Sequence, residues 1–257
     1  MRKAGWEGTA EGRRNGNLLA FFSPKGGAGS TTVITNVGIE LHRLTGKKTL
    51  LVDLDLELGE IASHMGVQPR FQEVTGEQIA RILGLLRSQY DYVLVDTSIS
   101  LAPPALAALQ TADPNFQNTN LDLPSLRNLK RCLPILDDAT AGDAERLRLV
   151  VNRANANGLV SLDDIEETLG IEVYWTLSND FQTVITSISA GRPLVLQGGS
   201  RYADELKALA NDIASGAQGA TRVKPSVMNR LLSRFRSTSS RNGTKRRNTQ
   251  DEVLAHD

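Results

Sequence analysis

A glycine-rich loop at residues 25–32 is the stretch of this sequence that points most directly to chemistry. It reads KGGAGSTT and ends in a pair of threonine hydroxyls. Glycines let backbone amides approach a ligand closely, and a helix that begins at such a loop adds free N–H groups and a positive dipole. The loop therefore predicts a polyphosphate site. Its residues are Gly26, Gly27, Ala28, Gly29, Ser30, Thr31 and Thr32.

One residue departs from the usual phosphate-binding loop, which ends in Gly-Lys followed by Ser or Thr. Ser30 occupies the place of that lysine. The lysine would neutralise charge that develops on a transferring phosphoryl group, so its loss removes transition-state stabilisation. Binding is less affected, because the amides and a magnesium ion would remain. The sequence leaves enzymatic activity open and favours hydrolysis that is slow or absent.

Three carboxylates are expected to meet near this loop. Asp53 and Asp55 follow the apolar run 49–52, and Asp96 closes the apolar run 92–95. In open α/β sheets the carboxyl ends of the strands face the ligand crevice. An apolar run closed by aspartate is also the Walker B pattern, whose carboxylate holds magnesium through water. We therefore predict a magnesium site that Thr31 ligates and Asp96 completes.

The elements that would position these residues alternate between two periodicities. Short apolar runs predict strands at 18–22, 49–52, 92–95, 147–151 and 173–177, and helical spacing predicts helices after the loop, near 75–86, 125–133 and 202–213, and from 161 onward. This alternation predicts an α/β fold with a mostly parallel sheet and helices on both faces, in one domain at residues 17–216. The polar residues 113–120 are expected to form a loop.

Composition fits one domain with appendages. The chain has 257 residues and a formal net charge of zero. It contains no apolar run of about 18 residues that would predict a membrane span. Its single cysteine, Cys132, leaves no internal disulfide, which favours a cytoplasmic protein. Residues 1–16 are expected to be a flexible segment. His42, His64 and His256 are scattered and are expected to be surface residues without a role.

The carboxyl-terminal tail, residues 217–257, differs from the body in charge. Residues 221–257 hold nine Lys/Arg against three acids, a formal charge of +6, which leaves −6 on the rest of the chain. A helix at about 226–236 would carry apolar residues on one face and arginines at its flanks, followed by a disordered end. Such a helix suits an anionic membrane surface. Nonspecific DNA binding and a last core helix are the alternatives.

With these motifs in this order, the chain resembles the ParA/MinD family of P-loop ATPases over about residues 17–215. The loop opens with Lys25, where this family carries its signature lysine, and the Asp53-Leu54-Asp55 and 90–96 stretches match as well. The resemblance implies ATP and Mg2+ as cofactors. It implies a homodimer across the nucleotide, in which Lys25 reaches the partner's phosphates.

The same resemblance implies roles for further residues. Asp55 would orient the attacking water, and Asp53 would lie near the metal with Asp96. Asn152, at the end of the strand 147–151, would recognise adenine, with Arg153 packing close by. Asp55 and Lys25 are thus the expected catalytic residues.

Three stretches, at 51–60, 121–128 and 191–196, are similar to the TadZ/CpaE branch of the family, which helps to position and assemble Flp-type (Tad) pili. Members of this branch often lack the second P-loop lysine, and in this chain Ser30 replaces that lysine. The branch implies pilus or secretion assembly proteins as partners and a place at the inner face of the cell membrane. Two departures are expected: no amino-terminal receiver-like domain, and one family strand with its helix missing between Asp53 and Asp96.

Two other functions stay open from the sequence. One is a chromosome or plasmid partitioning ATPase that binds DNA nonspecifically through the tail. The other is a scaffold that keeps the fold and binds no nucleotide. Measuring nucleotide binding separates the scaffold from the other two.

Overall fold

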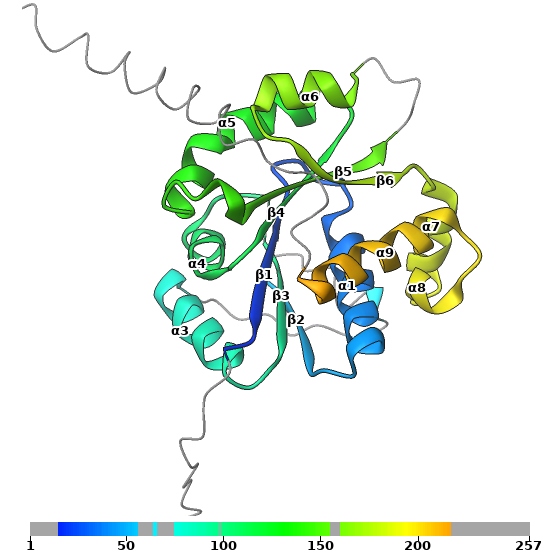
Figure 1. Cartoon of the computed structure of the whole chain (residues 1–257), viewed down its shortest axis with the longest axis horizontal. Coiled ribbons are helices and arrows are strands. Elements are labelled where there is room, and N and C mark those ends of the chain that lie inside the picture. Colours follow the sequence, from blue (N-terminus) through cyan, green and yellow to red (C-terminus); the bar gives the residue numbers. More distant parts are fainter. Residues whose placement is uncertain (1–14, 56–63, 66–74, 98, 155–159, 217–257) are drawn as a thin grey trace, which may run out of the picture. The chain divides into compact units, whose positions relative to one another are not determined.

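The computed structural model describes residues 15–55, 64–65, 75–97, 99–154 and 160–216 (Figure 1). It confirms the predicted α/β fold, a parallel sheet with helices on both faces. The tail from residue 217 onward, with the helix predicted at 226–236, lies outside the described residues. So do residues 1–14 of the predicted amino-terminal segment.

Strands and helices alternate along the chain. The first half contributes β1 (Asn17–Phe22), α1 (Ser30–Thr45), β2 (Thr49–Asp53), α3 (Gly76–Arg87), β3 (Tyr92–Asp96) and α4 (Pro103–Thr111). The second half contributes β4 (Asn115–Asn120), α5 (Leu123–Ala139), η1 (Ala144–Arg146), β5 (Leu147–Ala154), α6 (Leu162–Leu169), β6 (Val173–Ser178), α7 (Phe181–Ser189), α8 (Leu194–Gln197) and α9 (Arg201–Ser215). The sequence did not predict α4, α7 or α8, and α5 is longer than predicted.

The six strands form one sheet in the order β2-β3-β1-β4-β5-β6, and every pairing is parallel. Both faces of β1 are covered, which explains its unbroken apolar run. Leu18, Ala20 and Phe22 belong to the core beneath α3, α4, α5 and α6, whereas Leu19 and Phe21 belong to the core beneath α1, α8 and α9 (Figure 1). A parallel strand buried on both faces needs apolar residues at consecutive positions.

The prediction of a loop at residues 113–120 is wrong, because Asn115–Asn120 forms the central strand β4. All six of its residues are buried, and it pairs with β1 on one side and β5 on the other. Phe116 stacks on Phe21, with 4.6 Å between ring centroids. Backbone pairing on both sides and this stacking override the low strand propensity of asparagine and glutamine.

The missing family strand was predicted between β2 and β3. In the described residues no strand lies between these two in sequence, and β2 pairs with β3 alone. Residues 56–63 and 66–74 fall in this interval and are outside the described part of the chain. Separately, none of the helices described here has both the length and the apolar character needed to cross a bilayer.

Candidate functional site

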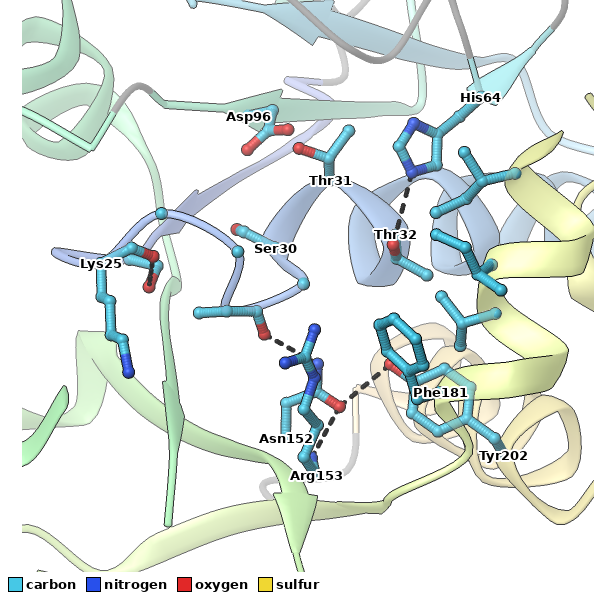
Figure 2. A pocket seen from close by; sticks show the side chains of 18 of the residues that line it. Lys25, Ser30, Thr31, Thr32, His64, Asp96, Asn152, Arg153, Phe181 and Tyr202 are labelled. Atoms are coloured by element: carbon cyan, nitrogen blue, oxygen red, sulfur yellow. Dashed lines mark hydrogen bonds between the residues drawn. The ribbon is translucent and has the colours of Figure 1, made fainter. Parts of the chain in front are cut away.

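The predicted site residues all line one cavity of about 370 Å³ at the carboxyl-terminal edge of the sheet. They come from the loop after β1 and from the ends of β2, β3 and β5. Figure 2 labels Lys25, Ser30, Thr31, Thr32, Asp96, Asn152 and Arg153 around the start of α1. Parallel strands whose carboxyl ends share an edge explain this convergence. The thirteen residues are Lys25, Gly26, Gly27, Ala28, Gly29, Ser30, Thr31, Thr32, Asp53, Asp55, Asp96, Asn152 and Arg153.

The loop has the backbone geometry of an anion cradle. Gly27 and Gly29 have φ values of 73° and 88°, in the left-handed region that favours glycine. Gly29 caps α1, which begins at Ser30 and so presents its first amides to the cavity. The Ser30 Oγ is buried and has no hydrogen-bond partner among the described residues. A buried hydroxyl of this kind, at a helix start, fits a phosphate oxygen.

Two asparagines of the sheet hold the loop by hydrogen bonds to its backbone. The side-chain amides of Asn118 on β4 and Asn152 on β5 both donate to the Ala28 carbonyl, at 3.0 and 2.8 Å. The Asn152 Oδ1 accepts from the Tyr202 hydroxyl at 3.0 Å and from the Arg153 amide at 2.9 Å. Burial raises the pKa of Tyr202, so its hydroxyl stays protonated as a donor. Among the described residues, the Asn152 Nδ2 donates one hydrogen bond, to the Ala28 carbonyl, and has a second N–H. Recognition of adenine by Asn152 remains a prediction.

The carboxylates lie beside the start of α1. Asp53 and Asp96 are register partners at the ends of β2 and β3. Asp96 is buried, and in Figure 2 its carboxylate points toward the Thr31 hydroxyl. The Asp55 amide donates to the Asp53 Oδ1 at 3.0 Å, which fixes the backbone after β2. This arrangement offers hard oxygen donors of the kind that magnesium prefers.

Lys25 is held by an acid of its own chain. Its Nζ lies 2.9 Å from the Asp122 Oδ2 and 3.0 Å from the Oδ1, and both side chains are 35% exposed. Asp122 also caps α5 by accepting from the Ser125 amide at 2.8 Å. Partial burial raises the pKa of Asp122, but the hydrogen bonds from Lys25 and Ser125 outweigh burial, and the pKa lies below its ordinary value. Asp122 is therefore ionised at neutral pH.

The far wall of the cavity is apolar and was not predicted. Phe181, Val184, Ile185 and Ile188 of α7 line it, and Phe181 remains 50% exposed. The Arg153 guanidinium lies 5.8 Å from the centre of the Phe181 ring, within the range of a cation–π contact. No sequence motif marks α7, so only its place after β6 brings it to the site.

His64 is not the surface residue that the sequence suggested. It is buried, lines the cavity, and its Nε2 lies 3.3 Å from the Thr32 Oγ1 (Figure 2). The sequence contains no metal-ligand spacing that includes His64, so it gave no signal for this position.

Three comparisons with known proteins agree with this geometry. A model of the CobQ/CobB/MinD/ParA nucleotide binding domain matches residues 19–194. A putative septum site-determining protein MinD from Guillardia theta is 26% identical over 223 residues, which cover 70% of this chain and 81% of that protein.

Solved structures share the fold. A ParA family ATPase from Chlorobium tepidum has a TM-score of 0.69 and 17% identity, over 78% of this chain and 100% of that one. MinD from Pyrococcus horikoshii, complexed with Mg-ADP, has a TM-score of 0.63 and 19% identity, over 80% of this chain and 99% of that one. At these identities the similarity concerns the fold alone.

Proposed function

The chain belongs to the family of CobQ/CobB/MinD/ParA nucleotide-binding domains, and we propose that it binds ATP with Mg2+ and dimerises across the nucleotide. The observation that carries the proposal is the single cavity that joins a left-handed glycine loop, the start of α1 and three strand-end carboxylates. Its amides and hydroxyls suit phosphates, and its carboxylates suit the cation that accompanies them.

The oxygen donors at the start of α1 and at the ends of β2 and β3 would bind magnesium only if phosphate oxygens supplied further ligands. Among the described residues, no three His, Cys, Asp or Glu side chains are grouped so that they could hold a metal ion. Thr31 would ligate the ion, Asp96 would hold one of its waters, and Asp53 would lie close by. Magnesium bound there supplies charge neutralisation on the phosphate oxygens. Magnesium usually keeps several waters and takes few protein ligands, which agrees with this set.

Slow or absent hydrolysis follows from Ser30. The loop amides can bind ground-state phosphates, but position 30 offers a hydroxyl where a cation would stabilise the transition state. Asp55, at the cavity edge, is proposed to orient the attacking water. Since orientation does not replace the missing charge, the protein would remain in its nucleotide-bound state for long periods. That property suits a switch that controls assembly.

Binding and turnover test this proposal together. Purified wild type should bind ATP–Mg2+ by calorimetry yet hydrolyse it slowly. Ser30→Lys should raise turnover by about a hundredfold with a smaller change in affinity, because a restored lysine acts mainly on the transition state. Asp55→Ala in the Ser30→Lys protein should remove that gain. Rapid hydrolysis by the wild type, or no ATP binding at all, would reject the proposal.

For the process served, we propose positioning and assembly of a pilus machine, as in the TadZ/CpaE branch. The support is the sequence similarity at 51–60, 121–128 and 191–196 and the serine at position 30. The partners would be pilus or secretion assembly proteins, and the basic tail would bind anionic lipid at the inner membrane face. Two tails in one dimer would bind more strongly than one.

Vesicle flotation of the full chain, compared with flotation of a chain ending at Gly216, tests whether the tail binds lipid. Equal flotation of both would exclude lipid binding by the tail.

The matching relatives support a second candidate. The relatives compared above are described as MinD proteins of septum site determination and as ParA family proteins. Positioning of a division site, or partitioning of DNA, would use the same nucleotide-dependent dimer. DNA retention by the tail in a filter-binding assay, without vesicle flotation, would favour partitioning over membrane positioning.

A further inference from the structure

The cavity would bring a polyphosphate close to three carboxylates. Asp53, Asp55 and Asp96 line it, and a bound polyphosphate would add further negative charge. Ser30 supplies no cation, and Lys25 is paired with Asp122 at the opposite end of the loop. Magnesium and the Lys25 of a second chain would neutralise part of this charge, and a further positive group of the same chain would strengthen binding.

Arg153 is placed to be that group. It follows Asn152, whose amide supports the phosphate loop through Ala28. In Figure 2 its side chain runs from the end of β5 toward the loop segment that ends at Ser30, with Phe181 beside it. Within the described part of the chain, no carboxylate lies within salt-bridge distance of its guanidinium. The guanidinium instead lies over the Phe181 ring, with its Cζ 5.8 Å from the ring centre.

The backbone at Arg153 has an unusual conformation. Its φ is 53°, in the left-handed region that non-glycine residues rarely adopt. The Asn152 Oδ1 accepts a hydrogen bond from the Arg153 amide and so stabilises that conformation. Strained residues of this kind persist where surrounding structure holds them, and they cluster at ligand sites. Arg153 also lies where the pairing of β5 with β6 is irregular, between Val151 and Ala154.

We propose that Arg153 contacts the phosphates of the bound nucleotide and supplies, within one chain, positive charge for nucleotide binding, whereas the transition-state contact of a lysine at position 30 stays absent. This inference rests on the proposed nucleotide site. A guanidinium can donate two parallel hydrogen bonds to a phosphate, and its delocalised charge also stacks on Phe181. The loop amides then bind from one side and Arg153 from the other. The alternative is that Arg153 stacks on the base, which predicts a different response to the number of phosphates.

Affinities of the full-length protein for ATP, ADP and adenosine, measured by calorimetry, test the proposal. Arg153→Gln should weaken ATP binding about tenfold or more, as expected for loss of a charge-assisted hydrogen bond, and should leave adenosine binding unchanged. In a Ser30→Lys background the same substitution should have a smaller effect on ATP, because the two cations would serve the same phosphates. Arg153→Gly accepts the positive φ without strain, so weakened ATP binding with an unchanged or higher Tm would exclude misfolding.

Arg148→Gln is the matched control. Arg148 lies on the same strand and also stacks on an aromatic ring, at 5.3 Å from the centre of Tyr174, but it does not line the cavity. It should leave all three affinities unchanged. Equal losses for ATP and adenosine in Arg153→Gln, or no loss for either, would overturn the role of Arg153 while the nucleotide site stands. A wild type that binds no ATP would overturn both.

Discussion

The Ala28 carbonyl receives two side-chain amides, and this shared acceptor fixes the path of the loop that follows it. Gly29 is the residue whose change would disturb it most. A Cβ at Gly29 would lie 2.3 Å from the Asn152 Nδ2, and the residue has a φ of 88°. Position 29 therefore has to lack a side chain for the loop and β5 to approach each other.

We expect Gly29→Ala to lower the free energy of unfolding by about 2–3 kcal/mol, from left-handed strain together with a displaced Asn152 hydrogen bond. Thermal or urea unfolding measures this. Gly27→Ala is the control, because Gly27 has a similar φ of 73° but open space where a Cβ would lie. It should cost only the strain, about 1–2 kcal/mol. Equal losses in the two variants would show that the Asn152 contact contributes nothing.

Asp122 pairs with Lys25 within the same chain, and we expect this pair to compete with contacts of Lys25 to a second chain. Asp122→Asn should still cap α5, because asparagine is as good a cap as aspartate. It should also release Lys25 and strengthen ATP-dependent dimerisation by up to about fivefold, since pairs this exposed contribute about 0–1 kcal/mol. Sedimentation equilibrium with ATP measures the dimer constant. Asp204→Asn removes another surface pair, with Lys207, and should have no effect. A weaker dimer in Asp122→Asn would contradict a restraining role.

Residue types and spacing, together with the resemblance to the ParA/MinD family, were sufficient to predict thirteen site residues, all of which line the cavity. They could not find His64, Phe181 or Tyr202, since none of these belongs to a local motif. Each reaches the cavity through tertiary packing. The sequence also could not show that Asn152 binds the Ala28 carbonyl, because that contact joins residues far apart in the chain.

Among the elements, β4 is the one whose sequence and environment disagree. Gln117 is buried at the centre of the sheet, and neither of its amide atoms has a partner among the described residues. Asn118 on the same strand instead makes the hydrogen bond to Ala28. The polar side chain of Asn118 thus supports the phosphate loop, whereas the polar side chain of Gln117 makes no such contact.

Gln117→Met should raise stability, because an apolar side chain of similar shape removes two unsatisfied buried groups. We expect a gain of about 1 kcal/mol or more, seen as an increase in Tm of about 2–4 °C per kcal/mol. Asn118→Leu is the contrasting variant on the same strand. It should lower Tm and weaken nucleotide binding. A lower Tm in Gln117→Met would mean that the amide is satisfied after all.

The apolar strands were predictable because both faces of a parallel sheet must be covered, which imposes runs such as 18–22 and 92–95. The strand β4 was not, because its position depends on backbone pairing with β1 and β5 rather than on its own propensity. The helix α7 was not predicted either. Its place also depends on tertiary structure, because its apolar residues partly face the cavity instead of the core.

For the whole molecule, the functional unit is expected to be a pair of chains. One chain provides the loop amides, the carboxylates and Arg153, but its Lys25 is bound to its own Asp122. We propose that nucleotide binding and release of Lys25 together favour the dimer. In this proposal Ser30 would keep the dimer long-lived by slowing hydrolysis. A long-lived dimer presents two tails and two partner surfaces at once.

Light scattering of the purified full chain, with and without ATP–Mg2+, tests this account most directly. We expect a monomer without nucleotide and a dimer with ATP for the wild type, and a monomer in both conditions for Lys25→Ala, even though Lys25→Ala still binds ATP by calorimetry. A wild type that stays monomeric at saturating ATP, or a Lys25→Ala protein that dimerises as well as the wild type, would contradict it.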